Sequence, residues 1–173
     1  MNFTPFPWFG KDRWSASETF PDPQLGHVLL DAKGGHPGND ASHAVIRRWN
    51  VPDAATIRIT GEVTLPDKNS RGVTALIVHS SKGVLWKADV PGGGKADPAP
   101  GTIAVEPGDT LDFILDNAGD PNSDSFAWSP VIRDTTSGLL IAHAATDFGG
   151  PGMSAWEAYA QVLLCTNEFL FVD

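Results

Sequence analysis

The densest group of potential metal ligands lies between positions 109 and 124, where the chain has five aspartates and no basic residue. Asp116, Asp120, Asn122 and Asp124 offer side-chain oxygens within a turn-forming stretch, spaced by four, two and two residues. Calcium takes six to eight oxygen ligands and tolerates irregular geometry, so this loop is a candidate site for a structural calcium ion. The alternative is a solvated turn in which Asp124 pairs with an arginine such as Arg48. The sequence leaves both open.

Aromatic residues suggest a second chemistry, because the chain has six tryptophans and nine phenylalanines but one tyrosine. An indole can stack on the C–H face of a pyranose ring while nearby polar groups bind its hydroxyls. Trp49 follows two arginines and precedes an amide, which is the combination that sugar recognition needs. The candidate ligand-binding residues are Trp14, Trp49, Trp86, Trp128, Arg47, Arg48 and His36. The alternative for each indole is burial in the core, where strand tryptophans of sandwich proteins often lie.

Catalytic patterns are weak by comparison. The chain has no Gly-x-Ser-x-Gly elbow, phosphate loop or His-Glu-x-x-His pattern, and its histidines show no zinc-binding spacing. A pair of carboxyl groups for glycoside hydrolysis could come from Glu62, Glu106, Asp109 or Asp112, but nothing in the sequence selects a pair. We therefore expect a protein that is not an enzyme.

The composition of the chain limits the classes of partner that it is expected to bind. The net charge of -9 disfavours nucleic acid as a partner, because phosphates would be repelled. No apolar run approaches the roughly 20 residues of a membrane helix, so we expect no membrane insertion. Cys165 is the single cysteine, which excludes an internal disulfide. With 18 glycines and 14 prolines, the chain is punctuated too often for a helical protein.

These side chains must be positioned by β-strands. Apolar and polar residues alternate over positions 57–65 and 111–115, which is typical of strands with one buried face. Further short strands are predicted at 42–49, 73–79, 83–90, 102–105, 126–128 and 139–142. Many short strands separated by turns, with no helix between them, predict an all-β protein. Our choice is an antiparallel, jelly-roll-like β-sandwich.

Three regions are predicted. Residues 1–25 are rich in aromatics and prolines and are expected to lie as an extended segment on the domain surface. Residues 26–148 form the sandwich module. Residues 149–173 comprise a linker, an amphipathic α-helix at 155–166 with a capping box from Ser154 to Glu157, and an apolar tail. The tail needs a partner surface, either on this domain or on a neighbouring one.

Two stretches also resemble a known family. The end of the chain, from Ala155-Trp156-Glu157 to Phe171-Val172-Asp173, is similar to the C-terminal end of large planctomycete surface proteins with cytochrome-c-like domains. Positions 36–37, 47–49, 51–52, 60–61, 108–109, 112–113 and 124–128 resemble a β-sandwich module found in some of them. The resemblance implies an extracellular or periplasmic location and a sandwich related to carbohydrate-binding modules. It carries over no haem, because no Cys-x-x-Cys-His motif occurs here.

Together these observations predict a non-catalytic carbohydrate-binding module of a secreted multidomain protein. Its expected ligand is a polysaccharide or oligosaccharide, bound by aromatic stacking, with calcium as a structural ion. The alternative is a structural domain that docks against sibling domains of a longer polypeptide. The third hypothesis is a glycan-degrading hydrolase or lyase.

Overall fold

A computed structural model of the protein describes residues 3–40 and 43–150, and these residues fold mainly as antiparallel β-strands. One layer of the fold, called layer II below, is a four-stranded sheet with the order β5-β12-β8-β9. Its strands are β5 (Val45–Asn50), β12 (Thr110–Asn117), β8 (Val73–His79) and β9 (Gly83–Val90).

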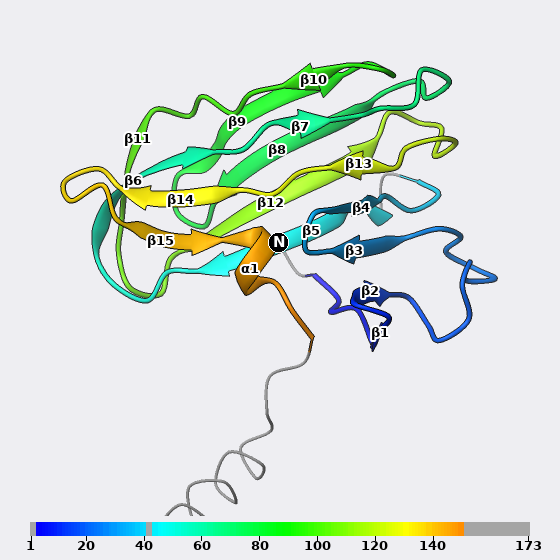
Figure 1. The fold of residues 1–173 in the computed structure, drawn as a ribbon, viewed down its shortest axis with the longest axis horizontal. Helices are drawn as coiled ribbons and strands as arrows, with labels where there is room; N and C mark the ends of the chain where they lie inside the picture. Colours follow the sequence, from blue (N-terminus) through cyan, green and yellow to red (C-terminus); the bar gives the residue numbers. More distant parts are fainter. Residues whose placement is uncertain (1–2, 41–42, 151–173) are drawn as a thin grey trace, which may run out of the picture.

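The opposite layer, layer I, consists of two sheets, and the chain runs directly from one sheet into the other. The four-stranded sheet has the order β11-β6-β14-β15. Its strands are β11 (Thr102–Val105), β6 (Ala55–Thr60), β14 (Val131–Asp134) and β15 (Leu140–His143). Figure 1 shows β6 running on into β7, and β14 lying in line with β13, so the two sheets lie side by side.

The second sheet of layer I has seven short strands in the order β1-β2-β3-β4-β13-β7-β10. They are β1 (Trp8–Gly10), β2 (Arg13–Ser15), β3 (Leu29–Asp31), β4 (Gly34–His36), β13 (Phe126–Ala127), β7 (Val63–Thr64) and β10 (Lys95–Ala96). Strand β4 needs glycine, because a Cβ atom at Gly34 would clash with the carbonyl oxygen of Phe126 on the paired strand.

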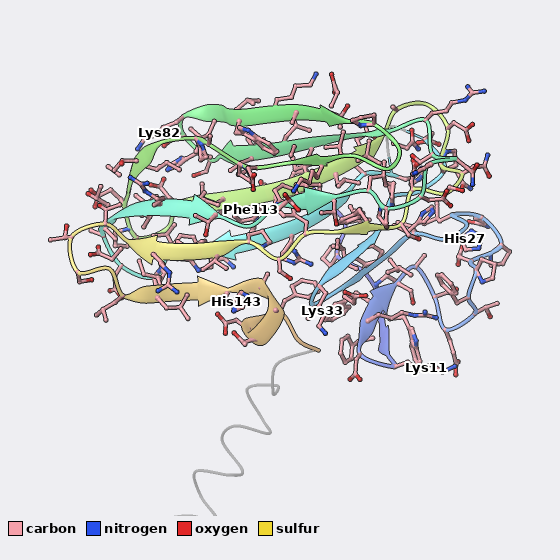
Figure 2. The ribbon with its side chains drawn as sticks, turned by 45° about the horizontal axis from the view of Figure 1, so that its top comes forward. Lys11, His27, Lys33, Lys82, Phe113 and His143 are labelled. Carbon is pink, nitrogen blue, oxygen red and sulfur yellow. The ribbon has the colours of Figure 1, made fainter. Side chains whose placement is uncertain are left out.

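The core lies between the layers and follows the alternation seen in the sequence. Ile57 and Ile59 of β6 are fully or almost fully buried, whereas Arg58 and Thr60 are exposed. Leu111 and Phe113 of β12 face them from layer II, and Figure 2 shows Phe113 between the strands. Burial of these apolar side chains is the main stabilising contribution to such a fold.

The prediction of an all-β, antiparallel sandwich is confirmed. The described residues contain one short helix, α1 (Ala144–Asp147), and no helix long and apolar enough to cross a membrane. The helix predicted at residues 155–166 lies outside the described residues.

Strand details differ from the sequence prediction. Within the segment 1–25, β1 and β2 pair with each other and continue the sheet through β3. Strands β3, β4, β10 and β14 lie where the sequence predicted no strand. These strands have two to four residues, so their side chains are too few to show a period of two.

Candidate functional site

The site with the best mixture of aromatic and polar groups is a hollow between strand β5 of layer II and the β15–α1 segment of layer I. Its volume is about 100 Å³. We call it the Trp49 hollow. It is lined by Arg47, Arg48, Trp49, Phe113, Pro130, Ile132, Ala142, His143, Ala144, Asp147 and Phe148. Three predicted ligand-binding residues, at positions 47, 48 and 49, therefore lie at one place.

Two aromatic side chains form walls of the hollow. Trp49 is half-buried at the edge of layer II and packs partly on the core, and Phe148 follows α1 and is also half-buried. The guanidinium carbon of Arg47 lies 4.6 Å from the centre of the Phe148 ring, a cation–π distance that holds the ring in place. The hollow thus offers aromatic surface with a cation behind it.

Polar groups come from the β15–α1 segment. The backbone N–H of His143 donates to Oδ2 of Asp147 at 2.7 Å, and the hydroxyl of Thr146 donates to Oδ1 at 2.7 Å. These bonds lower the pKa of Asp147, so it is ionised at neutral pH. A carboxylate has about four acceptor positions, which leaves capacity for a ligand hydroxyl. The imidazole of His143 is a second polar group on this wall.

Arg47 is a structural residue as well as part of the hollow. It is 6% exposed, and its terminal nitrogens donate to the backbone oxygens of Trp128 at 2.7 Å and Asp31 at 2.6 Å. Burial lowers the pKa of Arg47 to about 10, although nearby Asp31 acts in the opposite direction. Its Nε has no hydrogen-bond partner among the described residues. Through these two bonds Arg47 joins the two layers.

Arg48 points to the outer face of β5 and is paired with Asp112 on the neighbouring strand. Nε donates to Oδ1 at 2.7 Å and Nη2 donates to Oδ2 at 2.9 Å, which is a bidentate ion pair. The hydrogen bond to Asp112 raises the pKa of Arg48. The alternative pairing of Asp124 with Arg48 is therefore wrong, because Arg48 pairs with Asp112 and Asp124 is bonded to Ser70.

The other candidate tryptophans lie elsewhere. Trp128 is 2% exposed and packs in the core against Phe113, with ring centres 5.6 Å apart, so it offers no surface for stacking. Trp86 is half-buried and its ring lies 6.2 Å from that of Trp128. Trp14 packs on Phe9 and donates its indole N–H to the backbone of residue 149 at 2.7 Å. For Trp128, the alternative of burial in the core is therefore correct.

His36 does not line the Trp49 hollow. Its Nδ1 lies 2.7 Å from the backbone oxygen of Pro37, and its ring is 5.7 Å from that of His27. Figure 2 shows His27 well away from His143 of the hollow. Desolvation lowers the pKa of His36, which favours the neutral imidazole. The structure thus separates His36 from the other predicted ligand-binding residues.

The acidic loop is held by hydrogen bonds within the loop and by contacts with Ser70 and Arg71 of the β7–β8 loop. Asp120 accepts from the side chain of Asn122 and lies 3.2 Å from Nε of Arg71. Asp124 is fully buried and accepts from the hydroxyl of Ser70 at 2.5 Å. Burial raises the pKa of Asp116 and of Asp124. No three His, Cys, Asp or Glu side chains within residues 3–40 and 43–150 are grouped to hold a metal ion.

Calcium at this loop stays a prediction. Melting temperatures measured with added calcium and with a chelator test it. A rise with calcium that is lost in Asp120→Ala would support the ion, and identical values would count against it.

Three of the four carboxyl groups considered for hydrolysis are bonded within the fold. Glu62 lies 2.8 Å from Nζ of Lys95, and Asp112 pairs with Arg48. Asp109 accepts from the backbone N–H of Glu106 at 2.9 Å. None of these four described acids lines the Trp49 hollow.

Comparisons with known proteins add no family assignment. No protein-family model matches the chain, and no curated protein matches it.

Proposed function

We propose that this chain is a non-catalytic carbohydrate-binding module and that the Trp49 hollow is its sugar site. The observation that supports this most strongly is the meeting of Trp49 and Phe148 with His143 and Asp147 at one open hollow. Aromatic rings beside a carboxylate and an imidazole are the groups that bind a sugar ring and its hydroxyls. We further propose, on the resemblance described above, a place in a secreted multidomain protein.

The size of the hollow suggests how much of a glycan it holds. At about 100 Å³ it is smaller than the roughly 300 Å³ at which ligand-enclosing pockets begin. It therefore fits one edge or end of a sugar chain, with the remaining units on the surface. Binding of this kind is expected to be weak per site and to depend on the few rings that contact the sugar.

Calorimetry or affinity electrophoresis across a panel of neutral polysaccharides tests the proposal. Trp49→Ala should abolish measurable binding, and Phe148→Ala should weaken it. Trp86→Ala is the matched control, because Trp86 is also half-buried against the core but does not line the hollow. Melting curves establish that each variant is folded. No binding to any glycan, or equal loss in the Trp86 and Trp49 variants, would contradict the proposal.

One observation favours the docking alternative. A larger hollow of about 660 Å³ lies between the N-terminal segment and the outer side of β5, and its lining is mainly apolar. Phe3, Phe6 and Ile46 contribute to that lining. An apolar surface of this kind suits a protein partner such as a sibling domain. Failure to bind glycans together with self-association of the isolated chain would favour this function.

A further inference from the structure

Two arginines that are distant in sequence lie side by side on the outer face of layer I. Arg58 of β6 and Arg133 of β14 are direct partners in the antiparallel register, and both are exposed. Residues directly opposite each other in such a pair have Cβ atoms roughly 5 Å apart, on the same face. Thr102 of β11 and Leu140 of β15 extend this row on either side.

Neither arginine has a carboxylate partner in the part of the chain that the structure describes. Within the described residues, Arg58 takes part in no hydrogen bond or ion pair, and Arg133 makes only a long contact of 3.4 Å to the backbone oxygen of Gly138. Like charges directly opposite each other in a sheet are unfavourable. The chain as a whole carries a net charge of -9, with 21 acidic and 12 basic residues, so its overall field repels polyanions and binding at this face depends on the local pair of guanidinium groups.

Three acidic side chains of layer I and of the β15–α1 segment are engaged with other groups. Asp134, the next residue on β14, accepts hydrogen bonds from the backbone and hydroxyl of Ser137. Glu62 pairs with Lys95, and Asp147 is bonded to the backbone of His143. The fold therefore brings two cations together, and no carboxylate of residues 3–40 or 43–150 is paired with either of them.

We propose that the Arg58–Arg133 face binds the anionic groups of an acidic polysaccharide, either sulfate or carboxylate. A guanidinium group binds such an anion through two parallel hydrogen bonds, and two guanidinium groups this close can share one anion or bind successive ones. The open sheet face suits an extended polymer, and the hydroxyls of Thr102 and Thr60 border it. This surface is separate from the Trp49 hollow, so the inference goes beyond the proposed function.

Three polymers with one backbone test the proposal: dextran, carboxymethyl-dextran and dextran sulfate. At low ionic strength the protein should bind one or both charged polymers and bind neutral dextran far more weakly. The double variant Arg58→Gln/Arg133→Gln should lower affinity for the charged polymer by about tenfold or more, since two charge-assisted contacts are lost. Added salt should weaken wild-type binding, because both arginines are solvent-exposed.

A control separates this surface from net charge. Lys68→Gln/Lys87→Gln changes the net charge by the same amount at two exposed lysines outside the face. It should keep affinity within about twofold of wild type. Arg58→Lys/Arg133→Lys should bind more tightly than the glutamine double variant but more weakly than wild type, because the charge remains and the bidentate geometry is lost. Trp49→Ala should bind the charged polymers normally, which distinguishes this inference from the neutral-sugar site.

Three results would overturn the proposal: no binding of either charged dextran, an equal loss in the lysine control, or unchanged binding in Arg58→Gln/Arg133→Gln. Equal binding of a single-stranded DNA at the same salt would also overturn it, since the face would then lack preference for a glycan. Sulfate and carboxylate are distinguished by which of the two charged dextrans binds.

Discussion

Two pairs of arginines in this protein have opposite surroundings. Arg47 and Arg48 are neighbours in sequence, and because side chains alternate along a strand they point to opposite faces of β5. Arg47 donates to two backbone oxygens, and Arg48 donates to the carboxylate of Asp112. Arg58 and Arg133 are distant in sequence, but the β6–β14 register places them together, and neither pairs with a carboxylate among the residues described.

The difference shows why sequence clustering is a poor guide to a free binding group. Arg47 is buried and bonded to two backbone oxygens, and Arg48 is paired with a buried carboxylate, so the arginines beside Trp49 contribute chiefly to stability. An exposed pair of like charges contributes little to stability and remains free for an anion. The comparison predicts that substitutions in the first pair change the free energy of unfolding and those in the second change binding.

The largest effect is expected at Arg47. Arg47→Met removes donors from the buried oxygen of Trp128 and from that of Asp31, and unsatisfied buried groups are costly. We expect the free energy of unfolding to fall by about 3 kcal/mol. Arg58→Met, the matched exposed control, should change it by less than about 0.5 kcal/mol. Urea denaturation measures both, and similar values for the two variants would remove the distinction.

A smaller loss is expected at Arg48. Arg48→Gln leaves the carboxylate of Asp112, with 7% side-chain exposure, without its charge-assisted bonds. The free energy of unfolding should fall by about 2 kcal/mol, whereas Arg133→Gln should leave it nearly unchanged. A double-mutant cycle with Asp112→Asn should show coupling between the two positions. Additive effects in that cycle would mean that the pair contributes no stability.

The contrast between buried and exposed charge extends to two aspartates. Burial raises the pKa of Asp124 above 3.8, so its stabilising contribution is present below that value and is lost as the pH rises through the raised pKa. Asp124→Asn should therefore gain stability relative to wild type as the pH increases.

Asp134 provides the opposite case. Its hydrogen bonds from Ser137 and Thr136 lower its pKa below 3.8, so its contribution is present above that value and is lost on acidification. Asp134→Asn should lose stability relative to wild type as the pH increases. Denaturation between about pH 3 and pH 7 measures both slopes. Slopes of the same sign would contradict these assignments.

The smallest effect is expected from reversing one charge of the exposed pair. Arg58→Glu places a carboxylate opposite Arg133, and a cross-strand ion pair of this kind contributes roughly 0.2–1 kcal/mol. The free energy of unfolding should rise by about 0.5 kcal/mol, and binding to the charged dextrans should disappear. The free energy of unfolding should rise less in Arg58→Gln, because this substitution only removes the repulsion between the two arginines. A destabilised Arg58→Glu variant would indicate an unrecognised structural role for this arginine.

Much of the fold could be predicted because its longer strands alternate. Ile57 and Ile59 are buried beside exposed Arg58, as the pattern of β6 predicts. Asp112 and Ile114 of β12 are buried too, because neighbouring strands flank them on the outer face of layer II. Alternation predicts which face a residue occupies, but how well that face is covered depends on neighbours distant in sequence.

The candidate site could be predicted only in part, because its lining also depends on neighbours distant in sequence. Trp49 was found from its local context, and it does line the hollow. Phe148 and His143 were missed, because they reach the hollow through the packing of β15 and α1 against β5, which no local pattern encodes. Trp128 was chosen by residue type alone, and the structure places it in the core. The Arg58–Arg133 pair depends on strand register, which a single sequence does not reveal.

The most direct test of the central claim is a crystal structure of this chain soaked with an oligosaccharide from the best-binding polysaccharide of the neutral panel. We predict a sugar ring against Trp49 and Phe148, with hydroxyls near His143 and Asp147. A sugar bound reproducibly elsewhere, with the Trp49 hollow holding only solvent, would contradict the claim.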